Sequence, residues 1–295
     1  MLGKIGWIWA AITLALLGYG LHVALSVPPD ADQANVGRIL YYHVPTWVAM
    51  SFCFLANLLC SILYLATRSR SKKIALVADA VAVSSAEMGV VFCFLGMATG
   101  SLWGRAVWGI WWTWDARLTA TLVLWLIYLA YLMLRHVVAG EQMRTLAAVV
   151  AIFAYCDVPL VYMTTRWWRT QHPAPVFFGA PGAGVAPNLL VAVQWNIVAW
   201  LAWAILVVGI RYTAERRKQS ADQAAAVTAI QGSATRDTVT YGAIAAAIFP
   251  YDPRIDSQLA HQHLVMAYAL TWLVHLCYLF YVARKWHSAG KLETS

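Results

Sequence analysis

The sequence predicts an all-α integral membrane protein: a six-span helical bundle with a seventh C-terminal span and a short tryptophan-rich helix or loop on its outer face. The first observation is composition, since 61% of residues are hydrophobic, 12% are charged and the mean hydropathy is +0.62. The second is that the apolar residues form blocks of about 20, the length of helix that crosses a hydrocarbon core. The third is a tryptophan-dense stretch between two such blocks, SLWGRAVWGIWWTWDARLT at 101–119.

Seven apolar runs are long enough to be membrane spans. Their expected bounds are 5–27, 46–66, 74–98, 118–134, 145–164, 188–210 and 261–283. The first run is too long for the core of a signal peptide and lacks a small-residue cleavage site, so we expect it to be retained. We expect three regions: a six-span core over 1–211, a polar, alanine-rich linker or loosely held helix over 212–260, and a single span with a basic tail over 261–295.

Loop charges predict the orientation of the spans. Three alternate loops (67–73, 135–144 and 211–218) carry ten Lys and Arg, and the other three (28–45, 99–117 and 165–187) carry five. Because cytoplasmic loops are enriched in Lys and Arg, the N-terminus is expected in the cytoplasm and the tryptophan stretch on the periplasmic side. This topology accounts for the net charge of +8 without nucleic acid. The last span then places its basic end outside, unless 238–251 dips into the membrane.

The five cysteines do not indicate a metal site or a disulfide framework. All lie inside apolar runs, and none forms C-x-x-C or C-x-x-C-H. This argues against a zinc site and against a c-type cytochrome with its own attached haem. They are expected to be small packing residues: Cys53, Cys60, Cys93, Cys156 and Cys277.

Aromatic residues gather in the three outward loops and are almost absent from the cytoplasmic loops. An aromatic belt enriches Trp and Tyr at both interfaces, so a one-sided distribution indicates that something is bound on the outer face. Two of the eight histidines lie in these loops. His43 follows Arg38 and two tyrosines, and His172 follows Trp167, Trp168 and an arginine.

This set of residues matches the chemistry of haem. Haem is a flat apolar ring with two carboxylates at one edge, and its iron takes axial ligands such as His. Its binding therefore requires aromatic walls, one or two histidines and positive groups for the propionates. We expect His43 and His172 as axial ligands. The candidate propionate partners are Arg38, Arg105 and Arg117.

Spacing within the tryptophan stretch favours one binding face. If 104–117 forms a short interfacial helix, one side of it carries Gly104, Trp108, Trp111, Trp112 and Asp115. Glycines at 104 and 109 would let a flat ring approach the backbone. We expect Asp115 to orient the loop through a hydrogen bond or an ion pair with Arg117, rather than to perform acid–base chemistry.

Three motifs resemble one family. WGRAVWGIWWTWDARLT is similar to the WWD signature of the CcmC haem handlers of cytochrome c maturation. RILYYHVP and WWRTQH resemble that family's two histidine-bearing outer loops. The resemblance covers roughly residues 1–211, with six spans in the same order. The C-terminal span is faintly similar to the small single-span CcmD subunit, so a fusion is one interpretation; the resemblance assigns no role to 212–295.

The resemblance implies a haem carrier rather than an enzyme. Haem b would be the transported ligand, held between His43 and His172 at the outer face of the cytoplasmic (inner) membrane. The carrier would present it to a periplasmic haem chaperone, in a complex with two ABC transporter subunits and a small single-span subunit. The WWD residues expected at the haem are Trp103, Gly104, Trp108, Gly109, Trp111, Trp112, Trp114 and Asp115.

Two alternative functions stay open. The first is a cytochrome c synthase that attaches haem directly to an apocytochrome. Such synthases resemble this chain in the signature but continue WDP and an acidic residue, where this chain has WDARLT. The second is a structural membrane subunit without haem, whose tryptophans only anchor it.

Ionisable residues inside predicted spans are costly and therefore of interest. Glu87 is compatible with a contact to another helix, a haem entry path, a proton relay or packing against Ser84 or Ser85, and Asp79 lies two turns earlier. Asp157 is expected to satisfy backbone groups near Pro159. His22 and His275 are expected to be packing residues, and His261 and His263 weak metal candidates only if they face outward.

Overall fold

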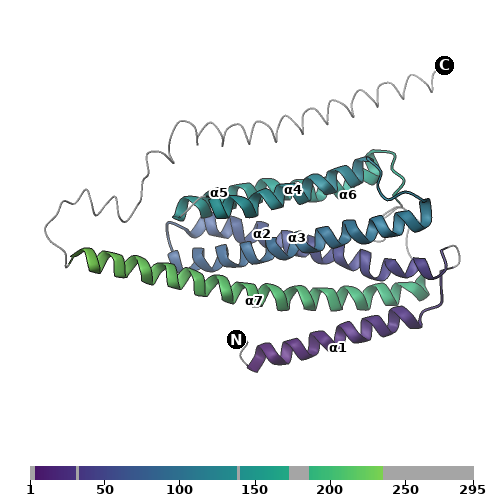
Figure 1. Ribbon diagram of the computed structural model, residues 1–295, viewed down its shortest axis with the longest axis horizontal. Coiled ribbons are helices and arrows are strands. Elements are labelled where there is room, and N and C mark those ends of the chain that lie inside the picture. Colours follow the sequence, from purple (N-terminus) through teal and green to yellow (C-terminus); the bar gives the residue numbers. More distant parts are fainter. Residues whose placement is uncertain (1–3, 31–32, 138–139, 173–185, 235–295) are drawn as a thin grey trace, which may run out of the picture. The chain divides into compact units, whose positions relative to one another are not determined.

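Figure 1 shows the protein as a computed structural model, which describes residues 4–30, 33–137, 140–172 and 186–234. The chain divides into two compact units, Met1–Ser220 and Ala221–Ser295. Within the first unit the helices run alongside one another as a bundle (Figure 1). The predicted span 261–283 lies outside the described residues, and so do His261, His263 and His275.

Every regular element in the described ranges is a helix, which confirms the predicted all-α fold. Within the part of the chain that the structure describes, six segments are long and apolar enough to cross a membrane. Helices α5 and α6 together form one of these segments, and the others are single helices or begin with a 3-10 turn. The elements are α1 (Lys4–Ser26), η1 (Asn35–Ile39), α2 (Leu40–Thr67), α3 (Lys72–Trp108), α4 (Ala116–Val137), α5 (Gly140–Tyr155), α6 (Asp157–Trp167) and α7 (Pro187–Ala234).

Of the two alternatives for the tryptophan stretch, a short helix or a loop, a separate helix over 104–117 does not form. Residues 104–108 are the last turns of α3, which continues ten residues beyond the predicted end at 98. Gly109 then adopts a left-handed conformation, with φ of 74°, and ends α3 as a glycine C-cap does. Residues 110–115 are not helical, and α4 begins at Ala116. The tryptophan stretch is therefore a helix end followed by a loop.

Two further boundaries differ from the expected ones. The fifth span is broken at Cys156, between α5 and α6, because Pro159 has no N–H to donate to the carbonyl of Tyr155. Asp157 is the first residue of α6 and is buried. The expected core boundary at 211 lies inside α7, which continues without interruption to Ala234.

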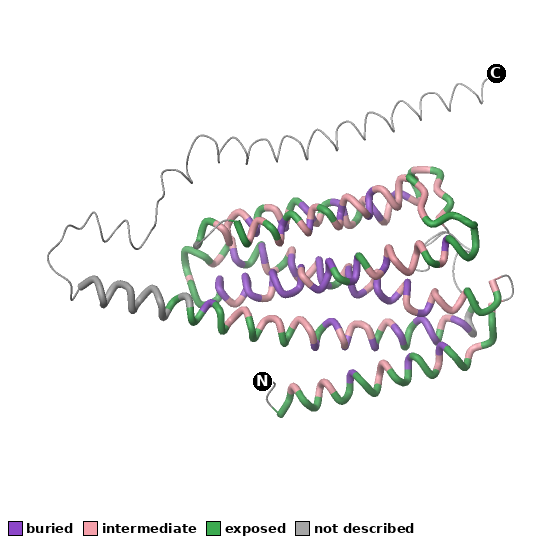
Figure 2. Tube along the Cα trace, in the orientation of Figure 1, coloured by how far each residue is buried: buried purple, intermediate pink, exposed green. Residues whose placement is uncertain are grey.

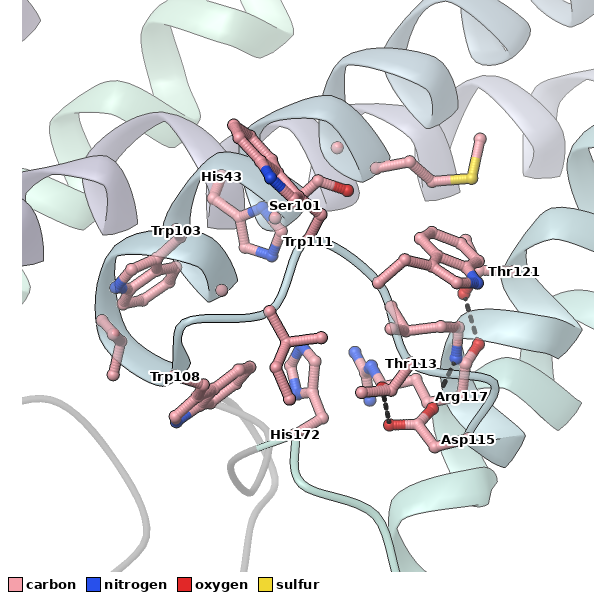
Figure 3. Close-up of a pocket in the computed structure, with 18 of the residues that line it drawn as sticks. His43, Ser101, Trp103, Trp108, Trp111, Thr113, Asp115, Arg117, Thr121 and His172 are labelled. Atoms are coloured by element: carbon pink, nitrogen blue, oxygen red, sulfur yellow. Dashed lines mark hydrogen bonds between the residues drawn. The ribbon is translucent and has the colours of Figure 1, made fainter.

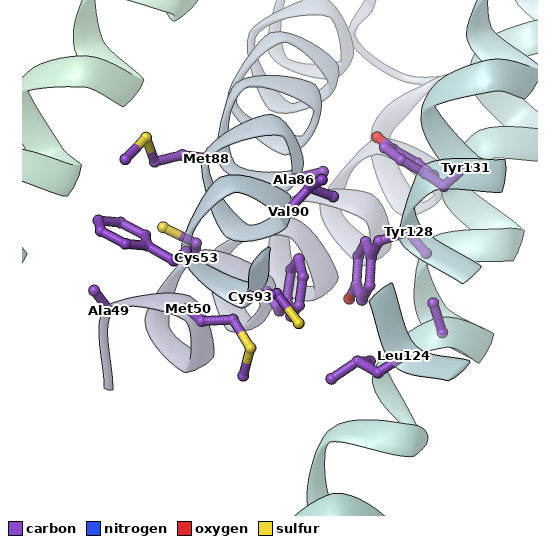
Figure 4. Close-up of a cluster of buried hydrophobic side chains, with 14 of the residues drawn as sticks. Ala49, Met50, Cys53, Ala86, Met88, Val90, Cys93, Leu124, Tyr128 and Tyr131 are labelled. Atoms are coloured by element: carbon purple, nitrogen blue, oxygen red, sulfur yellow. The ribbon is translucent and has the colours of Figure 1, made fainter. Parts of the chain in front are cut away.

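The core lies between α2, α3 and α4 (Figures 2 and 4). Phe54 on α2 stacks on Tyr128 on α4, with ring centroids 3.6 Å apart. A Cβ at Gly89 on α3 would lie 2.3 Å from the Phe54 ring, so this glycine lets the aromatic pair lie against the α3 backbone. Small residues at helix contacts allow this close approach in membrane bundles.

Two carboxylates on α3 form ion pairs with other helices. Asp79 is 3% exposed, and its carboxylate accepts hydrogen bonds from Nη1 and Nη2 of Arg135 on α4, at 2.7 and 3.0 Å. Arg144 on α5 lies 3.4 Å from the same carboxylate. About two turns along α3, Glu87 accepts two hydrogen bonds from Arg211 on α7, at 2.5 and 2.6 Å. Of the interpretations of Glu87, the structure supports a contact to another helix.

The two ends of the bundle differ in the residues that they hold. The arginine end holds Asp79, Arg135 and Arg144 together with the turn between α2 and α3. The tryptophan end holds residues 96–117, where α3 ends and α4 begins. The start of α2 and the end of α6 also lie at the tryptophan end (Figure 1).

Candidate functional site: an indole-lined cavity between two histidines

A cavity opens at the tryptophan end (Figure 3). Its empty volume is about 930 Å³, including the part open to solvent. Its walls come from α2, α3, the loop 109–115, α4, α6 and the segment after α6.

The structure brings together most of the residues singled out from the sequence. Those that line the cavity are His43, Trp103, Gly104, Trp108, Trp111, Trp112, Asp115, Arg117 and His172. Gly109, Trp114, Arg38 and Arg105 are not among its lining residues. Lining residues that the sequence analysis did not single out include Gln33, Trp47, Gly96, Met97, Gly100 and Thr113.

His43 is buried on the first turns of α2, with 6% of its surface exposed. Its Nδ1 lies 3.0 Å from the hydroxyl of Thr99 on α3, and its Nε2 accepts a hydrogen bond of 3.0 Å from the Trp47 indole. A Cβ at Gly100 would lie 2.9 Å from His43 Cε1. Thr99, Trp47 and the bare backbone of Gly100 therefore hold the imidazole in place.

His172 lies across the cavity from His43 (Figure 3). The two ring centroids are 6.4 Å apart and the ring planes differ by 30°. These imidazoles come from segments that are 129 residues apart in the chain (172 − 43), so the fold itself creates the pair. Within the described residues, no group of three or more His, Cys, Asp or Glu could hold a metal ion. The two imidazoles can supply two nitrogen ligands to a metal in the cavity.

Asp115 connects the tryptophan loop to the segment that carries His172. One carboxylate oxygen accepts the backbone N–H of Leu118 at 2.8 Å, which caps the start of α4. The other accepts the hydroxyl of Thr170 at 2.7 Å. The Thr170 oxygen in turn accepts the backbone N–H of His172 at 3.1 Å. A chain of two hydrogen bonds thus runs from Asp115 to the histidine.

Two buried donors of the cavity wall have no hydrogen-bond partner among the described residues: Nη1 of Arg117 and Nε1 of Trp112. A buried donor without an acceptor is costly, and a cationic one more so. Figure 3 shows the Arg117 guanidinium pointing toward the space beside His172. The two donors suit an anionic group of a bound ligand.

Two of the three arginines that the sequence suggested as propionate partners donate instead to backbone carbonyls. Arg38 donates to the carbonyls of Ala24 and Val27, and so ties η1 to the end of α1. Arg105 donates to the carbonyl of Gly109 and lies 5.9 Å from the Trp111 ring centroid as a cation–π pair. Only Arg117 of the three lines the cavity.

The indole walls are positioned in different ways. Trp103 donates to the side chain of Gln33 at 2.7 Å, and its ring meets His43 edge to face with centroids 5.7 Å apart. Trp108 and Trp111 are 46% and 56% exposed, so a ligand can reach them from outside. Trp114 is 75% exposed and contacts Trp112. Trp103, Trp108, Trp111 and Trp112 thus form an indole wall of the cavity that contains the two imidazoles.

Sequence comparison identifies the family. The family model described as CcmC, "Heme exporter protein C", matches residues 1–229. The chain belongs to the haem exporter protein C family. The match extends 18 residues beyond 211 (229 − 211), onto the part of α7 that follows the expected core boundary.

Relatives with the printed name "Heme exporter protein C" are similar over most of their length. The protein of Haemophilus influenzae is 31% identical over 221 residues, which cover 74% of this chain and 87% of the relative. That of Bradyrhizobium diazoefficiens is 32% identical, covering 71% and 76%. That of Escherichia coli K12 is 28% identical, covering 67% and 72%. In this member of the haem exporter protein C family, the cavity residues from His43 to His172 all lie within the matched region.

Proposed function

We propose that this protein binds haem at the outer face of the cytoplasmic membrane and presents it to an extracytoplasmic haem chaperone for the biogenesis of c-type cytochromes. The observation that carries the proposal is the pair His43 and His172, facing each other across an indole-lined cavity. The names of the relatives, which are haem exporters, agree with it.

The two imidazoles lie close enough to hold one ligand between them, because their ring centroids are 6.4 Å apart. His43 and His172 would supply imidazole nitrogens to the iron of a bound haem. Haem supplies the other four nitrogen ligands itself, so two histidines from the protein complete the coordination.

The remaining wall residues match the rest of the haem molecule. The porphyrin would lie against the exposed indoles of Trp108 and Trp111, which contribute stacking and exclude water. Arg117 Nη1 and Trp112 Nε1 would donate to one propionate, whose oxygens satisfy both otherwise unpaired donors. Arg38 and Arg105 hold backbone carbonyls, so we assign the propionate role to Arg117.

Topology and partners follow from the same proposal. In this proposal the arginine end lies in the cytoplasm and the cavity on the periplasmic side, which the excess of Lys and Arg in the loops 67–73, 135–144 and 211–218 supports. Haem b is the proposed ligand, because the described lining residues of the cavity include two histidines that could coordinate its iron and no cysteine that could attach it. The proposed partners are the haem chaperone, two ABC transporter subunits and a small single-span subunit, in keeping with the resemblance described above.

Absorption spectra of the purified protein test the proposal. Haemin-loaded wild-type protein should show the spectrum of six-coordinate, bis-histidine haem. His43→Ala and His172→Ala should each lose this low-spin signature and release haem faster. His22→Ala is the matched control, because His22 is exposed on α1 and should leave the spectrum unchanged. Wild-type spectra in both cavity variants would overturn the axial assignments.

The alternatives have separate signatures. Thioether bonds formed on an apocytochrome by this protein alone would indicate a cytochrome c synthase. Protein that carries no Soret band, even after expression in haem-replete cells, would indicate a structural subunit. A structural subunit without haem does not explain why Arg117 Nη1 and Trp112 Nε1, among the described residues, have no hydrogen-bond partner beside the two imidazoles.

A further inference from the structure

We propose that Trp47 is a release latch: its indole N–H competes with the haem iron for the lone pair of His43 and so weakens the iron–His43 bond. The inference rests on the proposed haem-binding function and assigns a role to a residue that the family signature does not include. Trp47 follows His43 by four residues on α2, which places both on one face of that helix.

Hydrogen bonding determines which nitrogen of His43 carries the proton. An indole N–H can only donate, so the 3.0 Å contact from Trp47 Nε1 requires His43 Nε2 to be the acceptor. In a neutral imidazole the proton then lies on Nδ1. The Thr99 hydroxyl donates to the carbonyl of Leu95 at 2.8 Å, which leaves its oxygen free to accept Nδ1–H at 3.0 Å. The three contacts are mutually consistent.

This arrangement occupies the one lone pair with which His43 can bind iron. Iron coordination at Nε2 must therefore displace the Trp47 N–H. When the iron–nitrogen bond breaks, the same lone pair returns to the indole, and the proton on Nδ1 stays in place throughout. Release needs no proton transfer and no redox step on the protein side.

Packing keeps Trp47 close to the histidine. A Cβ at Gly96 on α3 would lie 2.6 Å from the Trp47 ring, so the indole rests directly on the backbone of this glycine. Trp47 also meets His43 edge to face, with ring centroids 5.8 Å apart. A donor that cannot move far away remains available to recapture the imidazole as soon as the iron leaves.

A latch of this kind suits a protein that must give up its ligand. A hydrogen bond of ordinary strength changes an equilibrium constant by about threefold to tenfold. Competition by Trp47 therefore lowers haem affinity by about this factor, without removing a ligand. Thr99 acts in the opposite direction, because it holds the tautomer that presents Nε2 to the iron.

The test uses Trp47→Phe, which keeps an aromatic ring and removes the N–H. Full-length protein in detergent is loaded with haemin, and transfer of haemin to excess apomyoglobin is followed by absorbance. Trp47→Phe should release haemin about threefold to tenfold more slowly than wild type. Thr99→Val should release it faster. Trp200→Phe is the matched control and should not differ from wild type, because Trp200 Nε1 has no hydrogen-bond partner in the described structure.

Release from Trp47→Phe at the wild-type rate, or faster, would overturn the latch. A second measurement covers the case in which this variant does not fold. This measurement follows the N–H vibration of Trp47 in wild-type protein, which is assigned by its loss in a Trp47 benzothiophene analogue. On haemin loading, the band should shift to the frequency of a weaker hydrogen bond. An unchanged band would also overturn the latch. Failure of the proposed function looks different, since His43→Ala would then keep the wild-type haem spectrum.

Discussion

The two ends of the helical bundle use the same residue types in opposite ways. At the arginine end, the carboxylate of Asp79 binds both nitrogens of Arg135 and also accepts a hydrogen bond from Gln219 at 3.2 Å. At the tryptophan end, the buried Arg117 Nη1 has no hydrogen-bond partner among the described residues. At the arginine end, Asp79 and its partners thus join helices. At the tryptophan end, Arg117 Nη1 is available to a ligand under the proposed function.

The difference shows how stability and binding are separated in one bundle. Asp79 connects α3, α4, α5 and α7 through Arg135, Arg144 and Gln219, so its loss affects four helices. The cavity residues include the exposed indoles of Trp108 and Trp111. Substitutions at the arginine end should therefore alter unfolding, and those at the tryptophan end should alter haem binding.

Asp79→Ala should have the largest effect. It leaves Arg135 buried without its carboxylate, and breaking a buried ion pair on one side costs about 3–5 kcal/mol. Thermal unfolding in detergent, followed by circular dichroism, should show a large loss of stability. Glu141→Ala is the control, since Glu141 is exposed at the start of α5. Equal stability of the two variants would contradict the role of Asp79.

Arg117→Leu should come next and should act on binding alone. Hydrogen bonds to charged groups contribute about 1.5–3 kcal/mol, so haemin affinity should fall by about tenfold to a hundredfold. The free energy of unfolding should change little, because Arg117 Nη1 has no protein partner to lose in the described structure. Haemin titration of this variant beside Arg105→Leu, whose guanidinium holds Gly109, checks the assignment. A larger loss of affinity in Arg105→Leu would transfer the propionate role to that residue.

Thr170→Val should have the smallest effect of the three. The substitution removes the hydrogen bond to Asp115, so the segment before His172 is held less firmly. A lost hydrogen bond costs about 1 kcal/mol, so haemin affinity should fall by about fivefold. The spectrum should become a mixture of high-spin and low-spin haem. Thr165→Val serves as the control, because the Thr165 hydroxyl bonds within its own helix to the carbonyl of Tyr162. If both variants keep a homogeneous spectrum, Asp115 does not position the histidine.

The order of the first six spans could be predicted because each depends on local hydrophobicity. The internal structure of the tryptophan stretch could not be predicted from periodicity alone. The 3.6-residue spacing of Gly104, Trp108 and Trp111 predicted a separate helix, but a left-handed Gly109 interrupts the pattern. A glycine that follows a helical segment commonly ends the helix, so Gly109 is the residue from which the end of α3 could have been predicted.

The roles of the arginines depend on contacts between distant segments. Arg38 and Arg117 look equivalent in the sequence, each near an outer histidine or a tryptophan run. Only the fold shows that Arg38 donates hydrogen bonds to carbonyls at the end of α1, and that Arg117 lines the cavity. Trp47 was also missed, although its spacing of four residues from His43 on a predicted span is a signal that sequence reasoning can use.

The loop after α3 turns back over Gly104, where a Cβ would lie 3.2 Å from the carbonyl oxygen of Ile110. The same Cβ would lie 3.5 Å from the Trp108 ring, so position 104 meets both the main chain of the loop and one indole. A methyl group there would require the Ile110 carbonyl to move by a few tenths of an ångström. Alanine at this position would therefore push the loop away from α3 and change the shape of the cavity without removing any of its polar groups.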